Sequence, residues 1–122
     1  MKAERISSLP PELASINSTD TPTALNIILG HAIASQASDL FMQSQGTHYL
    51  VSLRQMGAIR QLVVVSHEKG TQLVNLIKSL AGMDLAERRH PLDGRWTHEV
   101  DNRAFDFRIN TMGTLHGEDL VL

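Results

Sequence analysis

Within the segment from Arg103 to Asn110, the residues from Phe105 onward alternate strictly between apolar and polar side chains. A period of two places successive side chains on opposite faces of an extended chain, so this pattern predicts a β-strand that is buried on one side. Phe105, Phe107 and Ile109 are expected to point into a core, and Arg108 is expected to point away from it. The chain therefore needs a sheet with one covered face and one open face.

The sequence predicts two amphipathic helices that can cover such a sheet. The first begins at Thr21, a favourable N-cap, with Pro22 at the first helical position, and it ends near Ser38. The second ends at Gly82, because glycine readily adopts the left-handed conformation that closes a helix. Apolar residues recur three and four positions apart in both segments. They are Leu25, Ile28, Leu29, Ala32, Ile33 and Ala37 in the first helix and Leu73, Leu76, Ile77, Leu80 and Ala81 in the second.

Short alternating or apolar runs between turn residues predict the strands. The expected strands are 39–45, 48–54, 58–65, 95–100, 103–110 and 118–122. This order of elements predicts an α+β fold, with an antiparallel sheet of five to six strands and the two main helices packed on one face. Residues 1–20 show no sustained period, so we expect a flexible leader or linker there and a domain over residues 21–122.

The composition excludes several classes of function. The 122 residues suffice for one domain, and the formal net charge of -2 gives no overall attraction to nucleic acid or to an anionic membrane. The absence of cysteine excludes disulfides and thiolate metal sites, and the six histidines lack the spacing of a metal site. We therefore expect no bound metal. No run approaches the ~20 apolar residues of a membrane span, so we expect a cytoplasmic protein.

Basic charge is concentrated toward the C-terminal end of the chain. The arginines of this stretch are Arg88, Arg89, Arg95, Arg103 and Arg108. The planar guanidinium group suits phosphate and carboxylate oxygens. The same arginines could instead pair with neighbouring acidic residues at the surface, where each pair contributes at most ~1 kcal/mol. Those acidic residues are Glu87, Asp93, Asp101 and Asp106. Arg108 stands out because a strand anchored by its apolar side holds the guanidinium in a defined direction.

Three segments resemble the N-terminal domain of the type II secretion and type IV pilus assembly ATPases. Residues 85–95 read Leu-Ala-Glu-Arg-Arg-His-Pro-Leu-Asp-Gly-Arg, residues 106–111 read Asp-Phe-Arg-Ile-Asn-Thr, and a Gly-Glu pair opens the apolar run at 117–122. The resemblance implies a PAS-like fold. It also implies that arginines of this domain contact the phosphates of ATP held on another domain. In this sequence they are Arg108 of the Asp-x-Arg motif, Arg95 of Asp-Gly-Arg, and Arg103, where many members have a Gly-Arg turn.

The same resemblance implies a non-catalytic part of a larger ATPase. The pattern Gly-x-x-x-x-Gly-Lys-[Ser/Thr] is absent from the sequence, so we expect no catalytic residue and no cofactor bound by this domain alone. ATP and Mg²⁺ are implied for the parent protein, which would couple ATP hydrolysis to protein export or pilus assembly. The implied partners are the C-terminal ATPase domain of the same or a neighbouring subunit, within a homo-hexamer, and an inner-membrane platform or adaptor protein. The parent would be cytoplasmic and peripheral at the inner membrane, and no nucleic acid is expected as a partner.

The predicted hairpin at 39–54 departs from the family pattern. Phe41, Gln43 and Ser44 stand where the family has His, Glu and Pro. Ser52 and Met56 replace an arginine and an aspartate. The polar contacts that the family makes through this hairpin are therefore not expected here.

Two other functions are compatible with parts of the sequence. One is a stand-alone PAS-like module that senses a small ligand or scaffolds partners. The other is a small hydrolase built on Asp39, His90 and Asp93, although these residues share no recognisable motif.

Overall fold

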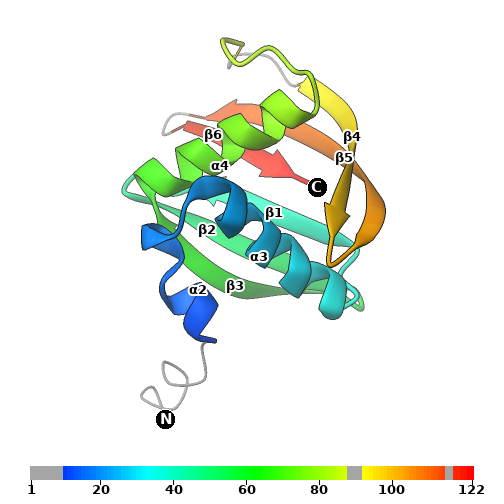
Figure 1. Cartoon of the computed structure of the whole chain (residues 1–122). Coiled ribbons are helices and arrows are strands. Elements are labelled where there is room, and N and C mark those ends of the chain that lie inside the picture. The colour runs from blue at the N-terminus through cyan, green and yellow to red at the C-terminus, as the bar shows by residue number, and fades with distance from the viewer. Residues whose placement is uncertain (1–9, 88–91, 115–116) are drawn as a thin grey trace.

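The computed structural model describes residues 10–87, 92–114 and 117–122 (Figure 1). The helical elements are α2 (Pro11–Ala14), the 3₁₀ helix η1 (Ile16–Ser18), α3 (Thr21–Ala34) and α4 (His67–Leu80). The strands are β1 (Asp39–Ser44), β2 (His48–Gln55), β3 (Ala58–Ser66), β4 (Leu92–Val100), β5 (Arg103–Thr114) and β6 (Gly117–Val121). These strands lie close to the positions that the sequence predicts.

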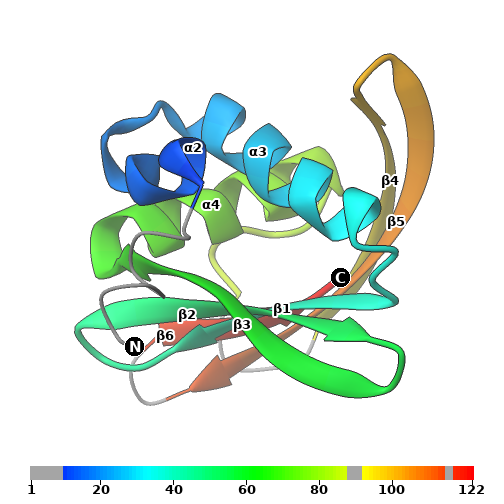
Figure 2. The same cartoon turned by 90° about the horizontal axis from the view of Figure 1, so that it is seen from below.

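The six strands form one antiparallel sheet in the order β3-β2-β1-β6-β5-β4. The first three strands pair in chain order, as do the last three, and the pairing of β1 with β6 joins these two halves of the sheet. Figure 2 shows that α2, α3 and α4 lie on one side of this sheet. The predicted α+β class is therefore confirmed. We call the sheet face that points away from these helices the open face.

The hydrophobic core lies between the helices and the covered face of the sheet. Every second strand residue points toward the helices, which is why the buried strand positions alternate. The buried apolar strand residues are Leu40, Met42, Tyr49, Val51, Leu53, Val63, Val65, Trp96, Val100 and Ile109. The buried apolar residues of α3 and α4 are Ala24, Leu25, Ile28, Leu29, Leu73, Val74 and Ile77. Full burial of one such large side chain contributes about 1.5–3 kcal/mol, so this layer is the main source of stability.

Residues 10–20 are folded, which corrects the prediction of a flexible leader or linker for this part of residues 1–20. Within this segment, α2 and η1 place Leu13 and Ile16 in the core, where they are 2% and 1% exposed. A helix of four residues is too short to show a period in the sequence, so the expected start of the fold at Thr21 is too late. Residues 1–9 lie outside the described ranges.

The first long helix is capped one residue earlier than predicted. Asp20 is the N-cap, and its carboxylate accepts a hydrogen bond from the Thr23 backbone N–H at 3.1 Å. Thr21 and Pro22 occupy the first two helical positions. The hydrogen bonds from Thr23 hold the pKa of Asp20 below its ordinary value. The helix ends at Ala34, before the predicted end near residue 38, because the chain turns there toward β1.

The second long helix ends as predicted and buries Leu73 and Ile77 of its predicted stripe, but the buried face differs from the prediction at one position and includes two lysines. Gly82 follows α4 at φ +69, the left-handed conformation expected of it. Leu80, predicted for the buried stripe, is 40% exposed. Lys69 and Lys78 are also buried, with their amino groups donating to backbone carbonyls. Lysine can bury its aliphatic stem in this way when its charged end has a partner.

The turn between β2 and β3 carries an unfavourable residue. Met56 has φ +51 and Gly57 has φ +81. Hairpin turns with two positive φ angles favour Asn or Asp at the first position, because longer side chains are strained there. Met56 is also 97% exposed, so packing does not offset this strain.

Met56→Asn should therefore raise the free energy of unfolding by about 1 kcal/mol, measured by urea denaturation. Met56→Ala is the matched control, because it shortens the side chain without supplying a polar group that tolerates the left-handed region. It should give a smaller gain. A Met56→Asn variant that is no more stable than the unmodified chain would contradict the prediction.

Candidate functional site

The β4–β5 hairpin brings Arg95 and Arg108 directly opposite each other. Its two-residue turn, Asp101–Asn102, has φ angles of +52 and +63, which Asp and Asn tolerate well. This turn sets the register in which Val100 faces Arg103 and Arg95 faces Arg108. Directly opposite Cα atoms in antiparallel strands are about 4.5–5.5 Å apart, so both guanidinium groups can reach one anion. We call Arg95 and Arg108 the arginine pair.

The arginine pair points to the open face. Both side chains are exposed, whereas the residues next to them along the strands point toward the helices. Trp96 and Phe107 stack there with ring centroids 4.9 Å apart, and Ile109 is fully buried. The predicted alternation of β5 is thus confirmed. This apolar side anchors both strands and fixes the direction in which the arginines leave the sheet.

Among the residues that the structure describes, the arginine pair makes none of the ion pairs that a surface arginine often makes. No described carboxylate lies within ion-pair distance of either guanidinium group. Arg54 shows the contrasting case on the same face, because its Nε lies 3.3 Å from Oδ2 of Asp39, its directly opposite neighbour on β1. Like charges placed directly opposite each other destabilise a sheet. An anion held between Arg95 and Arg108 would relieve that repulsion.

A shallow surface hollow surrounds the arginine pair. It has a volume of about 480 Å³ and is lined by Asp93, Gly94, Arg95, Arg108, Ile109 and Asn110. Gly94 has a structural reason to be glycine, because a Cβ there would lie 2.9 Å from Sδ of Met83. The missing side chain lets the segment after α4 pack closely against β4. The hollow is therefore lined by two positively charged guanidinium groups and by the backbone of β4, which packs closely against the rest of the domain.

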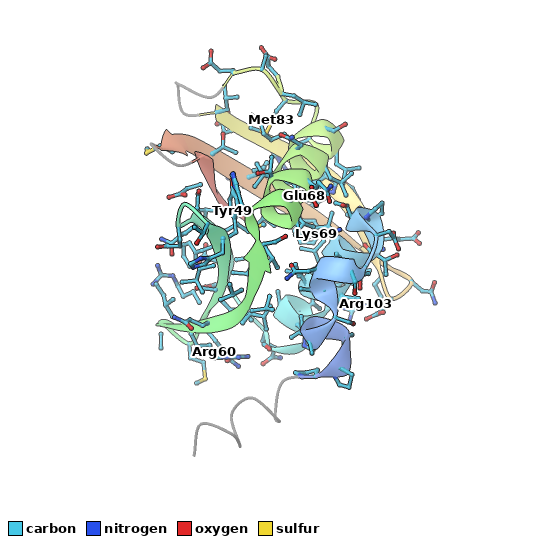
Figure 3. The ribbon with its side chains drawn as sticks, turned by 90° about the vertical axis from the view of Figure 1, so that its left-hand side faces the viewer. Tyr49, Arg60, Glu68, Lys69, Met83 and Arg103 are labelled. Atoms are coloured by element: carbon cyan, nitrogen blue, oxygen red, sulfur yellow. The ribbon has the colours of Figure 1, made fainter. Side chains whose placement is uncertain are left out.

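The structure separates Arg103 from the arginine pair. Arg103 follows the hairpin turn, and the alternation of β5 places it on the same side of the strand as Phe105. Its guanidinium carbon lies 5.2 Å from the centroid of the Phe105 ring. Figure 3 shows Arg103 at the tip of the hairpin. Two further arginines of the predicted basic stretch, Arg88 and Arg89, lie outside the described residues.

The residues considered for hydrolysis are not brought together where the structure describes them. Asp39 lies on β1 and Asp93 on β4, and the strands β6 and β5 lie between them. His90 lies outside the described residues. Within the described ranges, no group of three or more His, Cys, Asp or Glu side chains is arranged to hold a metal ion. No described helix has the length and apolar character needed to cross a membrane.

Sequence reasoning missed two residues beside the arginine pair. Thr97 faces Asp106 across the hairpin, and its hydroxyl donates to Oδ1 of Asp106 at 2.8 Å. Asn110 faces Asp93 and lines the hollow. Both could have been found from the sequence. Residues 101 and 102 separate two predicted strands, and counting outward from them gives every pair of opposite residues in the hairpin.

Comparisons with known proteins agree with the resemblance seen in the sequence. The family described as Type II/IV secretion system protein matches residues 17–122. Type II secretion system protein E of Pseudomonas aeruginosa is 37% identical over 98 residues, covering 80% of this chain and 20% of that protein. Type II secretion system ATPase E of Vibrio cholerae is 35% identical with the same coverage. The chain thus spans about 20% of the length of these curated relatives.

A solved structure shares the fold. The ATPase DotB of Legionella pneumophila superposes with a TM-score of 0.63, covering 84% of this chain and 28% of that one. The sequence identity is 18%, so this likeness concerns the fold alone. The family match, in contrast, extends from η1 to the end of the chain and includes the arginine pair. On this basis the chain belongs to the Type II/IV secretion system protein family.

Proposed function

We propose that this chain is the non-catalytic N-terminal domain of a hexameric secretion or pilus assembly ATPase, in which the arginine pair contacts the phosphates of bound ATP. The observation that carries the proposal is the register of the β4–β5 hairpin, which places Arg95 opposite Arg108 on the open face. ATP and Mg²⁺ would be held by the nucleotide-binding domain, since this sequence contains no phosphate-loop pattern.

The chemistry of the arginine pair suits a phosphate chain. Each guanidinium presents a planar fork of donors that matches two phosphate oxygens, and its charge persists at every physiological pH. Groups fixed in position before the reaction stabilise the charge that develops during phosphoryl transfer. The apolar side of β4 and β5 supplies that fixation for Arg95 and Arg108. Arg103 belongs to the hairpin tip, and we assign it no part in the same phosphate contact.

The open face supports packing against another domain. Three large apolar side chains on it are well exposed: Ile59 at 58%, Val64 at 50% and Met112 at 57%. Their partners across the strands place them on the same face as the arginine pair. Exposed apolar side chains near arginine are typical of protein interfaces. The partner in this proposal is the C-terminal ATPase domain of the same or a neighbouring subunit.

The wider setting follows from the family. A PAS-like domain that closes on bound ATP would link the nucleotide state to the arrangement of subunits in a homo-hexamer. The hexamer would act in the cytoplasm, at the inner membrane, through a platform or adaptor protein. Its work would be to couple ATP hydrolysis to protein export or pilus assembly. The named relatives from type II secretion support this setting.

Binding of inorganic tripolyphosphate to the chain tests the phosphate contact. Arg95→Gln and Arg108→Gln should each weaken binding about fivefold at low ionic strength, as expected for one exposed charge pair of ~1 kcal/mol. The measurement is a titration that follows the arginine side-chain N–H resonances by NMR, so the responding residues are identified directly.

Arg60→Gln is the matched control for these variants. It removes the same charge from β3, where the Arg60 guanidinium donates to Gln55 and Ser35 and is remote from the β4–β5 hairpin. It should change the affinity much less. The proposal fails if all three variants lose affinity equally, or if the unmodified chain does not bind tripolyphosphate.

A further inference from the structure

The inner edge of β5 is unpaired beside the arginine pair. β5 pairs with β4 from Arg103 to Thr111, whereas its pairing with β6 covers only Asn110 to Thr114. Among the described residues, no backbone hydrogen bond joins the part of β5 before Asn110 to any strand other than β4. An unpaired strand edge of this kind is a template for pairing with another strand.

The end of β6 shows which backbone groups of β5 point to this edge. Leu122 donates its N–H to the Leu40 carbonyl of β1 at 2.8 Å, and it accepts from the Leu40 N–H at 3.1 Å. Successive residues of a strand direct these groups to opposite sides, so Val121 and the residue next after Leu122 face β5. Asn110 is the partner of Val121. Arg108, two residues before Asn110, therefore directs its N–H and C=O to the unpaired edge.

A cleft lies along this edge, between β5, the start of β1 and the second half of α3. Its volume is about 480 Å³. Figure 2 shows the C-terminal end of the chain between β1 and β5, and Leu122 is among the residues that line the cleft. Asp106 and Arg108 line it from β5. Apolar side chains make up the opposite wall, among them Leu29, Ala32, Ile33 and Leu40.

We infer that this cleft holds the segment that follows Leu122 in the complete protein, as a continuation of β6 that pairs with β5. The inference rests on the proposed function, in which this domain is joined to a nucleotide-binding domain. With the register of β6 continued, the first residue after Leu122 lies opposite Arg108 and exchanges two backbone hydrogen bonds with it. The third residue pairs with Asp106 in the same way. The strand that carries Arg108 is then bonded directly to the segment that leads toward the nucleotide.

The same register defines the side chains that this segment needs. The first residue after Leu122 points to the open face, beside the arginine pair, because it faces Arg108. The second points to the covered side, opposite Phe107 and toward the wall formed by Ala32 and Ile33. That position requires an apolar side chain. Burial of this side chain and the new backbone hydrogen bonds both favour the ordered strand.

Amide hydrogen exchange followed by NMR tests this pairing. The chain that ends at Leu122 is compared with a longer form that continues through about six further residues of its reading frame, the usual length of a strand. The N–H groups of Asp106 and Arg108 should exchange at least about tenfold more slowly in the longer form, because they become hydrogen-bonded. The N–H groups of Phe105 and Phe107 point to β4 and should exchange alike in both forms.

Two variants of the longer form test whether the cleft holds the segment. Ala32→Phe places a ring where the segment is expected to lie, so it should return Asp106 and Arg108 to fast exchange. Ala34→Phe makes the same change on the exposed side of α3, outside this cleft, and should leave the two amides protected. Slow exchange of the Phe107 N–H in both variants verifies that the hairpin remains folded.

The outcomes separate this inference from the proposed function. Equal exchange of Asp106 and Arg108 in the two forms would overturn the inference alone. Protection that is already present in the chain ending at Leu122, and that increases with protein concentration, would instead assign the edge to a second copy. If the longer form is protected but Arg95→Gln and Arg108→Gln bind tripolyphosphate normally, only the phosphate contact is wrong. A reading frame that stops at Leu122 would refute both proposals.

Discussion

Replacing Arg108 with Ala in the complete ATPase that we propose carries this domain should lower ATP turnover by about 10³-fold, the lower end of the range for arginines that act on a transferring phosphate. Arg108 is exposed on the open face, while its neighbour Ile109 is fully buried and fixes the strand. Loss of the guanidinium would therefore remove a charge that is already in position. Steady-state ATP hydrolysis and export by the assembled machine are the measurements.

Two variants separate this role from a general effect of charge. Arg108→Lys keeps the charge but lacks the planar fork, so it should recover only part of the activity. Arg103→Ala removes a charge at the hairpin tip, on the other side of β5, and should leave turnover nearly unchanged. Unchanged ATP turnover and export in Arg108→Ala would refute the proposed role of Arg108.

Replacing Gly70 with Ala should lower the free energy of unfolding by about 3 kcal/mol, as overpacking of a tight core does. A Cβ at Gly70 would fall on the Tyr49 ring and lie 2.8 Å from Tyr49 Cβ. Tyr49 is 2% exposed, and its ring stacks on that of His67 with centroids 5.8 Å apart. The ring therefore cannot move aside without disturbing the contact between α4 and β2, which is visible in Figure 3. Chemical denaturation of the purified chain measures the loss.

Gly30→Ala is the matched control for this prediction. Gly30 lies inside α3, and nothing is within 4 Å of a Cβ built there. Alanine should raise the stability by about 0.5–1 kcal/mol, because it reduces the entropy lost when the helix forms. Tyr49→Leu should reduce the effect of Gly70→Ala, since the two residues are in contact. Similar losses in Gly30→Ala and Gly70→Ala would show that the Tyr49 contact is not the cause.

Much of the fold could be predicted because most of its elements are long enough to show a period. The strict alternation at 105–110 predicted the buried and exposed sides of β5 correctly, including the outward direction of Arg108. The short helices α2 and η1 were not predicted, because they are held by packing against the rest of the domain and not by a pattern in their own sequence. Leu13 and Ile16 are single apolar residues in a polar segment, and only the packing of the chain against the sheet shows them to be buried.

The sequence suggests which arginines form the candidate site, but their arrangement relative to each other was not predicted. Arg95 and Arg108 were both selected from sequence, yet their direct opposition depends on the register, which follows from the turn at Asp101–Asn102. The same register shows that Arg103 belongs to the other side of the strand. Burial of Lys69 and Lys78 could not be predicted, because it depends on carbonyl partners brought close by tertiary packing.

The two-residue turn of the hairpin imposes a rule on sequence spacing. Residues that face each other across such a turn are always separated by an odd number of positions, as Arg95 and Arg108 are. One inserted residue between the turn and either arginine would rotate that side chain toward the helices, unless a bulge absorbed it. Some distant relatives have sequences that no longer align. There, an odd number of positions between two arginines can therefore identify the pair that is equivalent to Arg95 and Arg108.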